Sequence, residues 1–143
     1  MDEVLALREI LLRNLEHGRQ LADNLEARFL RTFGPSSIED GTMSVYTYTS
    51  EVLMVALMDA LAENDEKSRV KCLEEVSRAL ESALELPSEN VRDAIDLRVV
   101  DRLLGSPRDW LELRPYVGSK FRARMLDRVR YFNWNEDVFG PLI

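Results

Sequence analysis

The residues best able to do chemistry by their type and spacing lie near the end of the chain, in the segment SKFRARMLDRVRYFNWN at 119–135. On a helix, Lys120, Arg124 and Arg128 follow one another at intervals of four residues and form a single ridge. Tyr131 extends this ridge. Such a ridge could bind an anion, either a phosphate, a nucleic acid or an acidic protein. The same pattern also fits a solvated helix face that attracts acidic helices of its own molecule.

The charge of the whole chain limits what this ridge can bind. The 143 residues carry a formal net charge of −7, and residues 1–95 hold 10 Lys and Arg against 19 Asp and Glu. Three phosphate contacts would bind nucleic acid weakly and with a strong dependence on salt, and the acidic rest of the chain repels the same ligand. Nucleic-acid binding through 119–135 is therefore the alternative hypothesis. The first hypothesis is another protein, possibly a basic one, steered by the acidic helices.

The C-terminal tail, EDVFGPLI, offers a second candidate for binding. It is unusually apolar for a chain end, since such ends are commonly polar and mobile. Phe139 and Ile143 could insert into a groove of a partner. Alternatively, the tail folds back over the core of its own molecule.

Catalytic and metal-binding patterns are not found. His17 is the only histidine and Cys72 the only cysteine, so a zinc site of Cys and His has two residues to draw on. The sequence GSK at 118–120 lacks the upstream glycine of a phosphate-binding loop. Carboxylates are plentiful, but most lie opposite the apolar stripes. We therefore expect no catalytic residue, no metal and no cofactor.

The elements that must position these residues are helices. Apolar or small side chains recur at spacings of three and four from residue 2 to about 33, which predicts one long N-terminal helix. Gly18 and Ala22 lie on this stripe, and Gly18 could kink the helix, end it, or admit another backbone closely. A straight helix of this length measures about 48 Å, more than the diameter of a globule of this size. Its projecting end would make a homodimer through this helix plausible.

Four further helices precede the basic segment. The patterns predict them at about 44–64, up to residue 86, at 88–105 and at 107–113, with Ser88 and Ser106 as N-caps. Ser119 is predicted to cap the last helix. The strand-like alternation TMSVYTYT has no second strand to pair with, so it is interpreted as the entry to the helix at 44–64. The fold class is all-α, with residues 1–143 as one domain and an irregular bundle of five to six helices.

No segment is apolar enough to cross a membrane, since the longest apolar run is residues 52–58. The N-terminus has no basic region before an apolar one, and the single cysteine suits a reducing compartment, so a cytoplasmic location is expected. The predicted function is a helical protein–protein interaction module: an adaptor, an inhibitor of the immunity type or an assembly subunit.

Overall fold

The computed structural model describes residues 2–34 and 43–140, and every regular element in these ranges is a helix. The α-helices are α1 (Glu3–Asn14), α2 (Gly18–Phe33), α4 (Val45–Tyr48), α5 (Met54–Ala62), α6 (Glu66–Leu84), α7 (Glu89–Ile95), α8 (Asp101–Leu104), α9 (Pro107–Leu113) and α10 (Ser119–Tyr131). Short 3₁₀ turns follow α9 at Arg114–Tyr116 and α10 at Glu136–Phe139. The predicted all-α class is confirmed.

Two π-helical turns join four of these segments into two longer rods. The first π turn, Thr49–Leu53, connects α4 to α5, so residues 45–62 form one continuous helix. The second π turn, Asp96–Val100, connects α7 to α8 over residues 89–104. Counted as rods, the described residues form seven helices rather than the predicted five to six.

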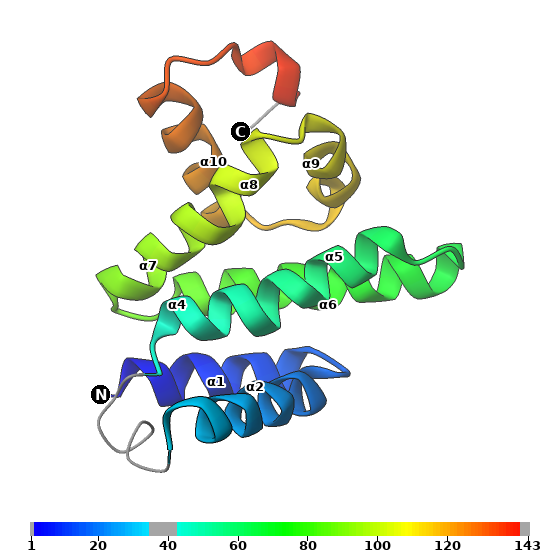
Figure 1. The fold of residues 1–143 in the computed structure, drawn as a ribbon. Coiled ribbons are helices and arrows are strands. Elements are labelled where there is room, and N and C mark those ends of the chain that lie inside the picture. Colours follow the sequence, from blue (N-terminus) through cyan, green and yellow to red (C-terminus); the bar gives the residue numbers. More distant parts are fainter. Residues whose placement is uncertain (1, 35–42, 141–143) are drawn as a thin grey trace.

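The helices are stacked in tiers (Figure 1). The α1–α2 hairpin forms one outer tier, and α4–α5 with α6 form the middle one. The rod α7–α8 rises at an angle from the middle tier, with α10 on one side of its end and α9 on the other, and α10 also contacts α6. One apolar cluster runs through all the tiers and includes the fully buried Trp110 and Phe121.

Side-chain caps begin some of the helices, in one case at the predicted residue. The Asp2 carboxylate accepts hydrogen bonds from the backbone N–H groups of Val4 and Leu5, which caps α1. Ser88 caps α7 in the same way, as the sequence predicts. Ser106 precedes α9, but its side chain makes no capping hydrogen bond.

The long N-terminal helix is the main correction to the predicted fold. The chain leaves the helical conformation at Leu15, and Gly18 begins a second helix that packs back against the first. Residues 2–33 therefore form a hairpin, and the overhang that suggested a homodimer is absent. Residues 35–42, which lie between the predicted helices at 2–33 and 44–64, are outside the described residues.

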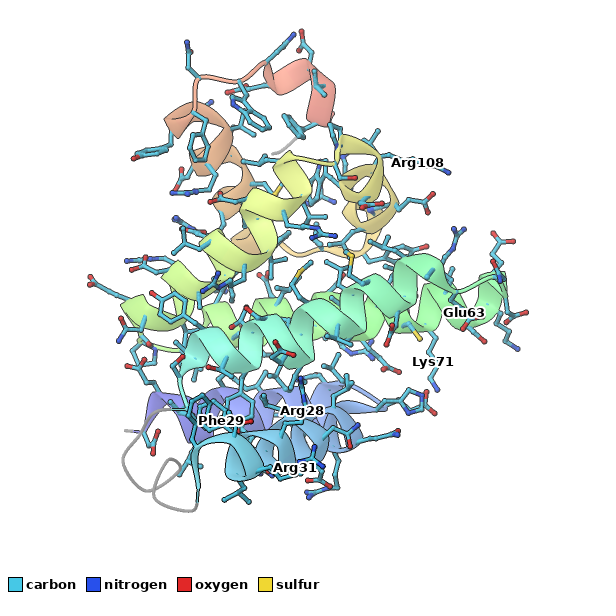
Figure 2. The ribbon with its side chains drawn as sticks, in the orientation of Figure 1. Arg28, Phe29, Arg31, Glu63, Lys71 and Arg108 are labelled. Atoms are coloured by element: carbon cyan, nitrogen blue, oxygen red, sulfur yellow. The ribbon has the colours of Figure 1, made fainter. Side chains whose placement is uncertain are left out.

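The α1–α2 corner is held in place by α6. The buried Glu75 carboxylate accepts the backbone N–H of Glu16 at 2.9 Å, and Lys71, labelled in Figure 2, forms an ion pair with the Glu16 side chain at 3.2 Å. A Cβ atom on Gly18 would lie 2.5 Å from the Leu11 carbonyl oxygen. Glycine is required here by this close approach of the backbone.

Within the described ranges, none of the helices is both long and apolar enough to cross a membrane.

Candidate functional site

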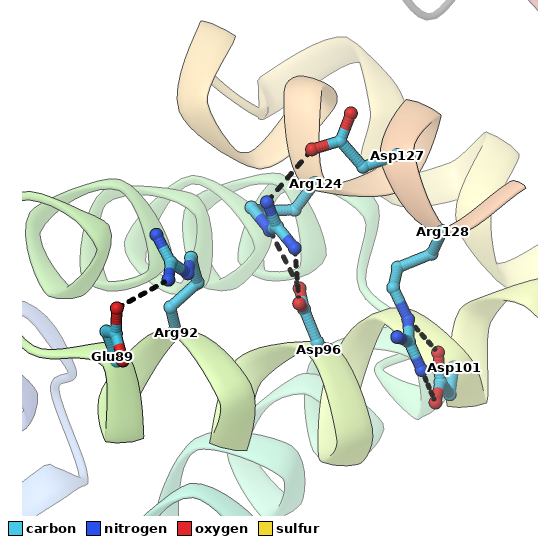
Figure 3. A network of polar contacts seen from close by, with 7 residues as sticks. All are labelled: Glu89, Arg92, Asp96, Asp101, Arg124, Asp127 and Arg128. Carbon is cyan, nitrogen blue, oxygen red and sulfur yellow. Dashed lines mark hydrogen bonds and ion pairs between the residues drawn. The ribbon is translucent and has the colours of Figure 1, made fainter. Parts of the chain in front are cut away.

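The basic ridge of α10 faces the rod α7–α8 and is held there by ion pairs (Figure 3). Arg124 donates to both oxygens of Asp96, at 2.9 and 2.5 Å, and to Asp127 at 3.0 Å. Arg128 donates to both oxygens of Asp101, at 2.9 and 2.7 Å. Such bidentate arginine–carboxylate pairs are among the strongest charge-assisted contacts in proteins. Their hydrogen bonds raise the pKa values of both arginines above the ordinary value, against the opposing effect of burial.

The second π turn gives Asp96 and Asp101 the spacing that these arginines need. In a regular α-helix, residues five apart point about 140° away from each other around the axis. Here the Asp101 N–H bonds to the Asp96 carbonyl, which closes a turn over five residues. The two carboxylates therefore face the same helix, α10, and meet arginines that are four residues apart.

The start of α10 is occupied by a carboxylate of the same molecule. Glu81 of α6 accepts the backbone N–H groups of Lys120 and Phe121 at 3.0 and 3.3 Å. The N-cap position belongs to Gly118, where an added Cβ would lie 2.6 Å from the Glu81 side chain. Ser119 is therefore not the cap, and the helix N-terminus that would attract a phosphate is already filled.

The ridge residue Lys120 is also matched by a carboxylate, since its ammonium lies 3.8 Å from Glu85. Three of the four predicted ridge residues thus contact acidic groups of their own chain. This arrangement favours the self-attraction interpretation of the ridge over an open anion site.

The fourth ridge residue, Tyr131, belongs to a group of exposed apolar side chains beyond the paired arginines. We call this group the aromatic surface; its members are Tyr131, Phe132, Trp134 and Val138. Tyr131 is 74% exposed and the other three are 41–49% exposed. Tyr131 meets Phe132 edge to face at 5.0 Å between ring centroids, and Phe132 lies 6.1 Å from Trp134. The Arg128 guanidinium lies about as close, 5.1 and 5.0 Å, to the Tyr131 and Phe132 rings.

A defined helix end sets the positions of these rings. Asn133 adopts a left-handed conformation with φ 55°, and its N–H bonds to the Arg130 carbonyl. The Trp134 N–H bonds to the Val129 carbonyl at 3.0 Å. These two bonds form a Schellman motif, a common way to end a helix, with asparagine at the position that requires positive φ.

The segment after this turn packs against the molecule through Phe139. Its side chain is 1% exposed, its ring stacks on Trp134 at 6.0 Å, and its carbonyl accepts the Trp110 indole N–H at 2.7 Å. The structure thus favours the interpretation in which the tail folds back. Ile143, the other predicted tail contact, lies outside the described residues.

Charges around the aromatic surface are balanced or acidic. Arg128 is paired with Asp101, and Arg130 with Glu136 at 2.9 Å. Asp137 is also exposed. The surface is therefore apolar with a polar rim, and it does not combine its rings with unpaired cations, as single-stranded nucleic-acid sites do.

A separate polar centre lies where the α1–α2 hairpin meets the start of α4. Glu26 accepts hydrogen bonds from Arg8 at 2.5 Å and from the Tyr48 hydroxyl at 2.7 Å. These three residues line a cavity of about 450 Å³ together with Asp2, Val4, Leu5 and Met43. Burial, followed by the bond to Glu26, raises the pKa of Tyr48 well above its ordinary value. No sequence pattern indicated this centre, because its members come from three different helices.

Stability should depend on pH through Glu26. Burial opposes ionisation of this carboxyl, but the bonds from Arg8 and Tyr48 outweigh it and leave the pKa of Glu26 below its ordinary 4.5. A lowered pKa stabilises the fold at higher pH, and this stabilisation is lost as the pH falls below about 5. We expect Glu26→Gln to unfold more easily than wild type at pH 7, with the difference shrinking towards pH 3. Urea titrations at several pH values measure this.

The exposed Glu89→Gln is the matched control, since that carboxylate pairs only loosely with Arg92 at 3.8 Å. A difference between wild type and Glu26→Gln that stayed constant from pH 7 to pH 3 would contradict the assigned role.

The remaining candidates for chemistry are the single histidine and the single cysteine. His17 is exposed at the α1–α2 corner, and burial raises the pKa of the Cys72 thiol, which disfavours a reactive thiolate. In residues 2–34 and 43–140, no three His, Cys, Asp or Glu side chains are grouped so that they could hold a metal ion.

Comparisons with protein-family models, with curated proteins and with solved structures give no match to this chain.

Proposed function

We propose that this chain is a helical protein-binding module, an adaptor, inhibitor or assembly subunit, that contacts its partner through the aromatic surface. The supporting observation is the exposure of Tyr131, Phe132 and Trp134 side by side at one end of the fold. Tyrosine and tryptophan, together with arginine, are the residues that most often dominate the binding energy of protein interfaces. A role of this kind requires no reaction from the chain itself.

The acidic charge of the chain supports a basic partner. A net charge of −7 attracts a basic surface at long range, which speeds encounter, while the aromatic surface would supply short-range burial. Nucleic-acid binding through 119–135 is the weaker proposal, because Arg124 and Arg128 are already paired with carboxylates.

The test starts with a partner captured from the native source and then purified, so that its dissociation constant can be measured by calorimetry. Tyr131→Ala is expected to weaken binding by about 30-fold, the loss typical of a residue that dominates an interface. Leu111→Ala is the matched control, since Leu111 is 46% exposed on α9 and lies outside the aromatic surface. This control should bind the partner with an affinity within about twofold of the wild-type value.

Equal effects of the two substitutions would contradict a site at the aromatic surface. A titration of RNA and DNA at two salt concentrations separates the alternative. Binding at low salt that Arg124→Glu/Arg128→Glu abolishes, and that Tyr131→Ala does not, would favour nucleic acid over a protein partner.

A further inference from the structure

The two π turns lie against each other where the rods 45–62 and 89–104 cross. In each turn the closing backbone N–H bonds to the carbonyl five residues earlier, from Met54 to Thr49 and from Asp101 to Asp96. Single π turns within α-helices are rare and occur frequently at functional sites. Two of them in contact therefore point to a functional site at this crossing.

Both π turns are braced by buried polar side chains at their first residues. The Thr49 hydroxyl donates to the Val45 carbonyl at 2.7 Å. Asp96 is fixed by Arg124, as described above. These contacts hold the two rods at a defined crossing, beyond which α5 and α8 diverge (Figure 1).

A hollow of about 380 Å³ lies between the diverging rods. Met54, Val55 and Met58 of α5 form its apolar wall, and Arg98 and Arg102 face them from the other rod. Methionine side chains are flexible and polarisable, and proteins use them where a surface must fit apolar side chains of a partner.

The two arginines of the hollow differ from Arg124 and Arg128 of α10 because neither is paired with a carboxylate of the described residues. Arg98 lies over the Tyr46 ring at 5.8 Å, and Arg102 contacts the Met58 sulfur at 3.6 Å. Asp59 and Ser50 complete the described lining. With two arginines against one aspartate, the hollow is locally positive in a chain whose net charge is −7.

We propose that this hollow docks an acidic amphipathic helix of another protein. Apolar side chains three and four residues apart on that helix would lie between Met54 and Met58. Its Asp or Glu side chains would pair with Arg98 and Arg102, whose planar groups suit carboxylates. Charge complementarity favours this occupant, and no residue of the aromatic surface lines the hollow.

The probe is a fluorescein-labelled synthetic helix of about 15 residues, with Leu at i, i+3, i+4 and i+7 and Glu at the other positions. Its counterpart carries Lys in place of Glu. Anisotropy is measured at about 150 mM salt, where long-range repulsion by the acidic chain is largely screened. We expect saturable binding of the Glu peptide, with a Kd below about 100 µM, and binding of the Lys peptide at least about tenfold weaker.

Arg98→Met/Arg102→Met keeps the apolar part of each side chain but removes its charge. This variant should bind the Glu peptide at least about tenfold more weakly than wild type. The control Arg13→Met/Arg31→Met removes the same charge from the α1–α2 hairpin. Figure 2 shows Arg31 on this outer tier, away from the hollow. The control should change the affinity for the Glu peptide by less than about twofold.

Methyl NMR signals of Met54 and Met58 report the location directly, and they should shift on titration with the Glu peptide while the fold, followed by circular dichroism, stays unchanged. The proposal is overturned if the control variant loses as much affinity as the Arg98 and Arg102 variant, if the methionine signals do not move, or if no saturable binding occurs. Tyr131→Ala should bind the Glu peptide with the affinity of the wild type. A negative result for the hollow therefore does not count against partner binding at the aromatic surface.

Discussion

Phe139→Ala is expected to lower the free energy of unfolding by about 3–4 kcal/mol. The Phe139 side chain is almost fully buried, and its removal deletes the stacking on Trp134 and leaves a cavity beside Trp110. Domains of this size have a total stability of about 5–15 kcal/mol, so the loss is a large fraction of it. Urea denaturation followed by circular dichroism measures the change.

Tryptophan fluorescence adds a local readout for the same variant. Opening of the segment 136–139 would expose the Trp110 indole, whose N–H now bonds to the Phe139 carbonyl, and the emission should shift to longer wavelength. Val138→Ala is the control, because its side chain is half exposed, and it should change stability by less than about 0.5 kcal/mol. An unchanged stability of Phe139→Ala would mean that this ring is available for a partner.

Arg124→Met should lower the free energy of unfolding by about 3 kcal/mol at neutral pH. The substitution leaves Asp96, whose side chain is only 7% exposed, as a buried charge without its partner. Replacing both residues, as in Asp96→Leu/Arg124→Met, should recover most of the loss, because an apolar pair of similar volume often substitutes for a buried ion pair. Denaturant titrations of the two single variants and the double variant give the coupling energy.

This experiment also distinguishes the two interpretations of the basic ridge. If Arg124 served only an external anion, Arg124→Met would leave the stability close to that of wild type. Strictly additive effects of the two single substitutions would show that the pair contributes nothing beyond its separate residues.

Helical periodicity predicted much of the fold. The stripe through Val70, Leu73, Val76 and Leu80 corresponds to α6, and the basic segment corresponds to α10. These predictions succeeded because each helix buries one face, and a buried face leaves a spacing of three and four residues in the sequence. The strand-like segment TMSVYTYT was also predicted correctly as the start of the helix at 44–64.

The break between α1 and α2 could not be predicted in the same way. Leu11, Leu15 and Ala22 keep a helical spacing across it, so the pattern continues although the helix does not. What supports the corner is a hydrogen bond from Glu16 to Glu75, which is 59 residues away in the sequence. Contacts of this range leave no local periodic signal.

The carboxylate partners of Arg124 and Arg128 could not be predicted from the sequence for a related reason. A regular helical wheel places Asp96 and Asp101 on different faces, and the π turn that unites them has no sequence pattern of its own. The aromatic side chains were visible in the sequence, but their exposure depends on where α10 ends. The tail allowed two interpretations, because an apolar chain end is compatible with self-burial and with insertion into a partner.

The Schellman end of α10 has a consequence for the entropy of association. Two backbone hydrogen bonds fix the main chain at Asn133 and Trp134, so the backbone that carries the rings is held by the helix end and not by a flexible loop. A partner that covered them would immobilise few additional torsions on this side. Loss of conformational freedom usually opposes complex formation, and here the main-chain part of that ordering is already complete when the chain folds.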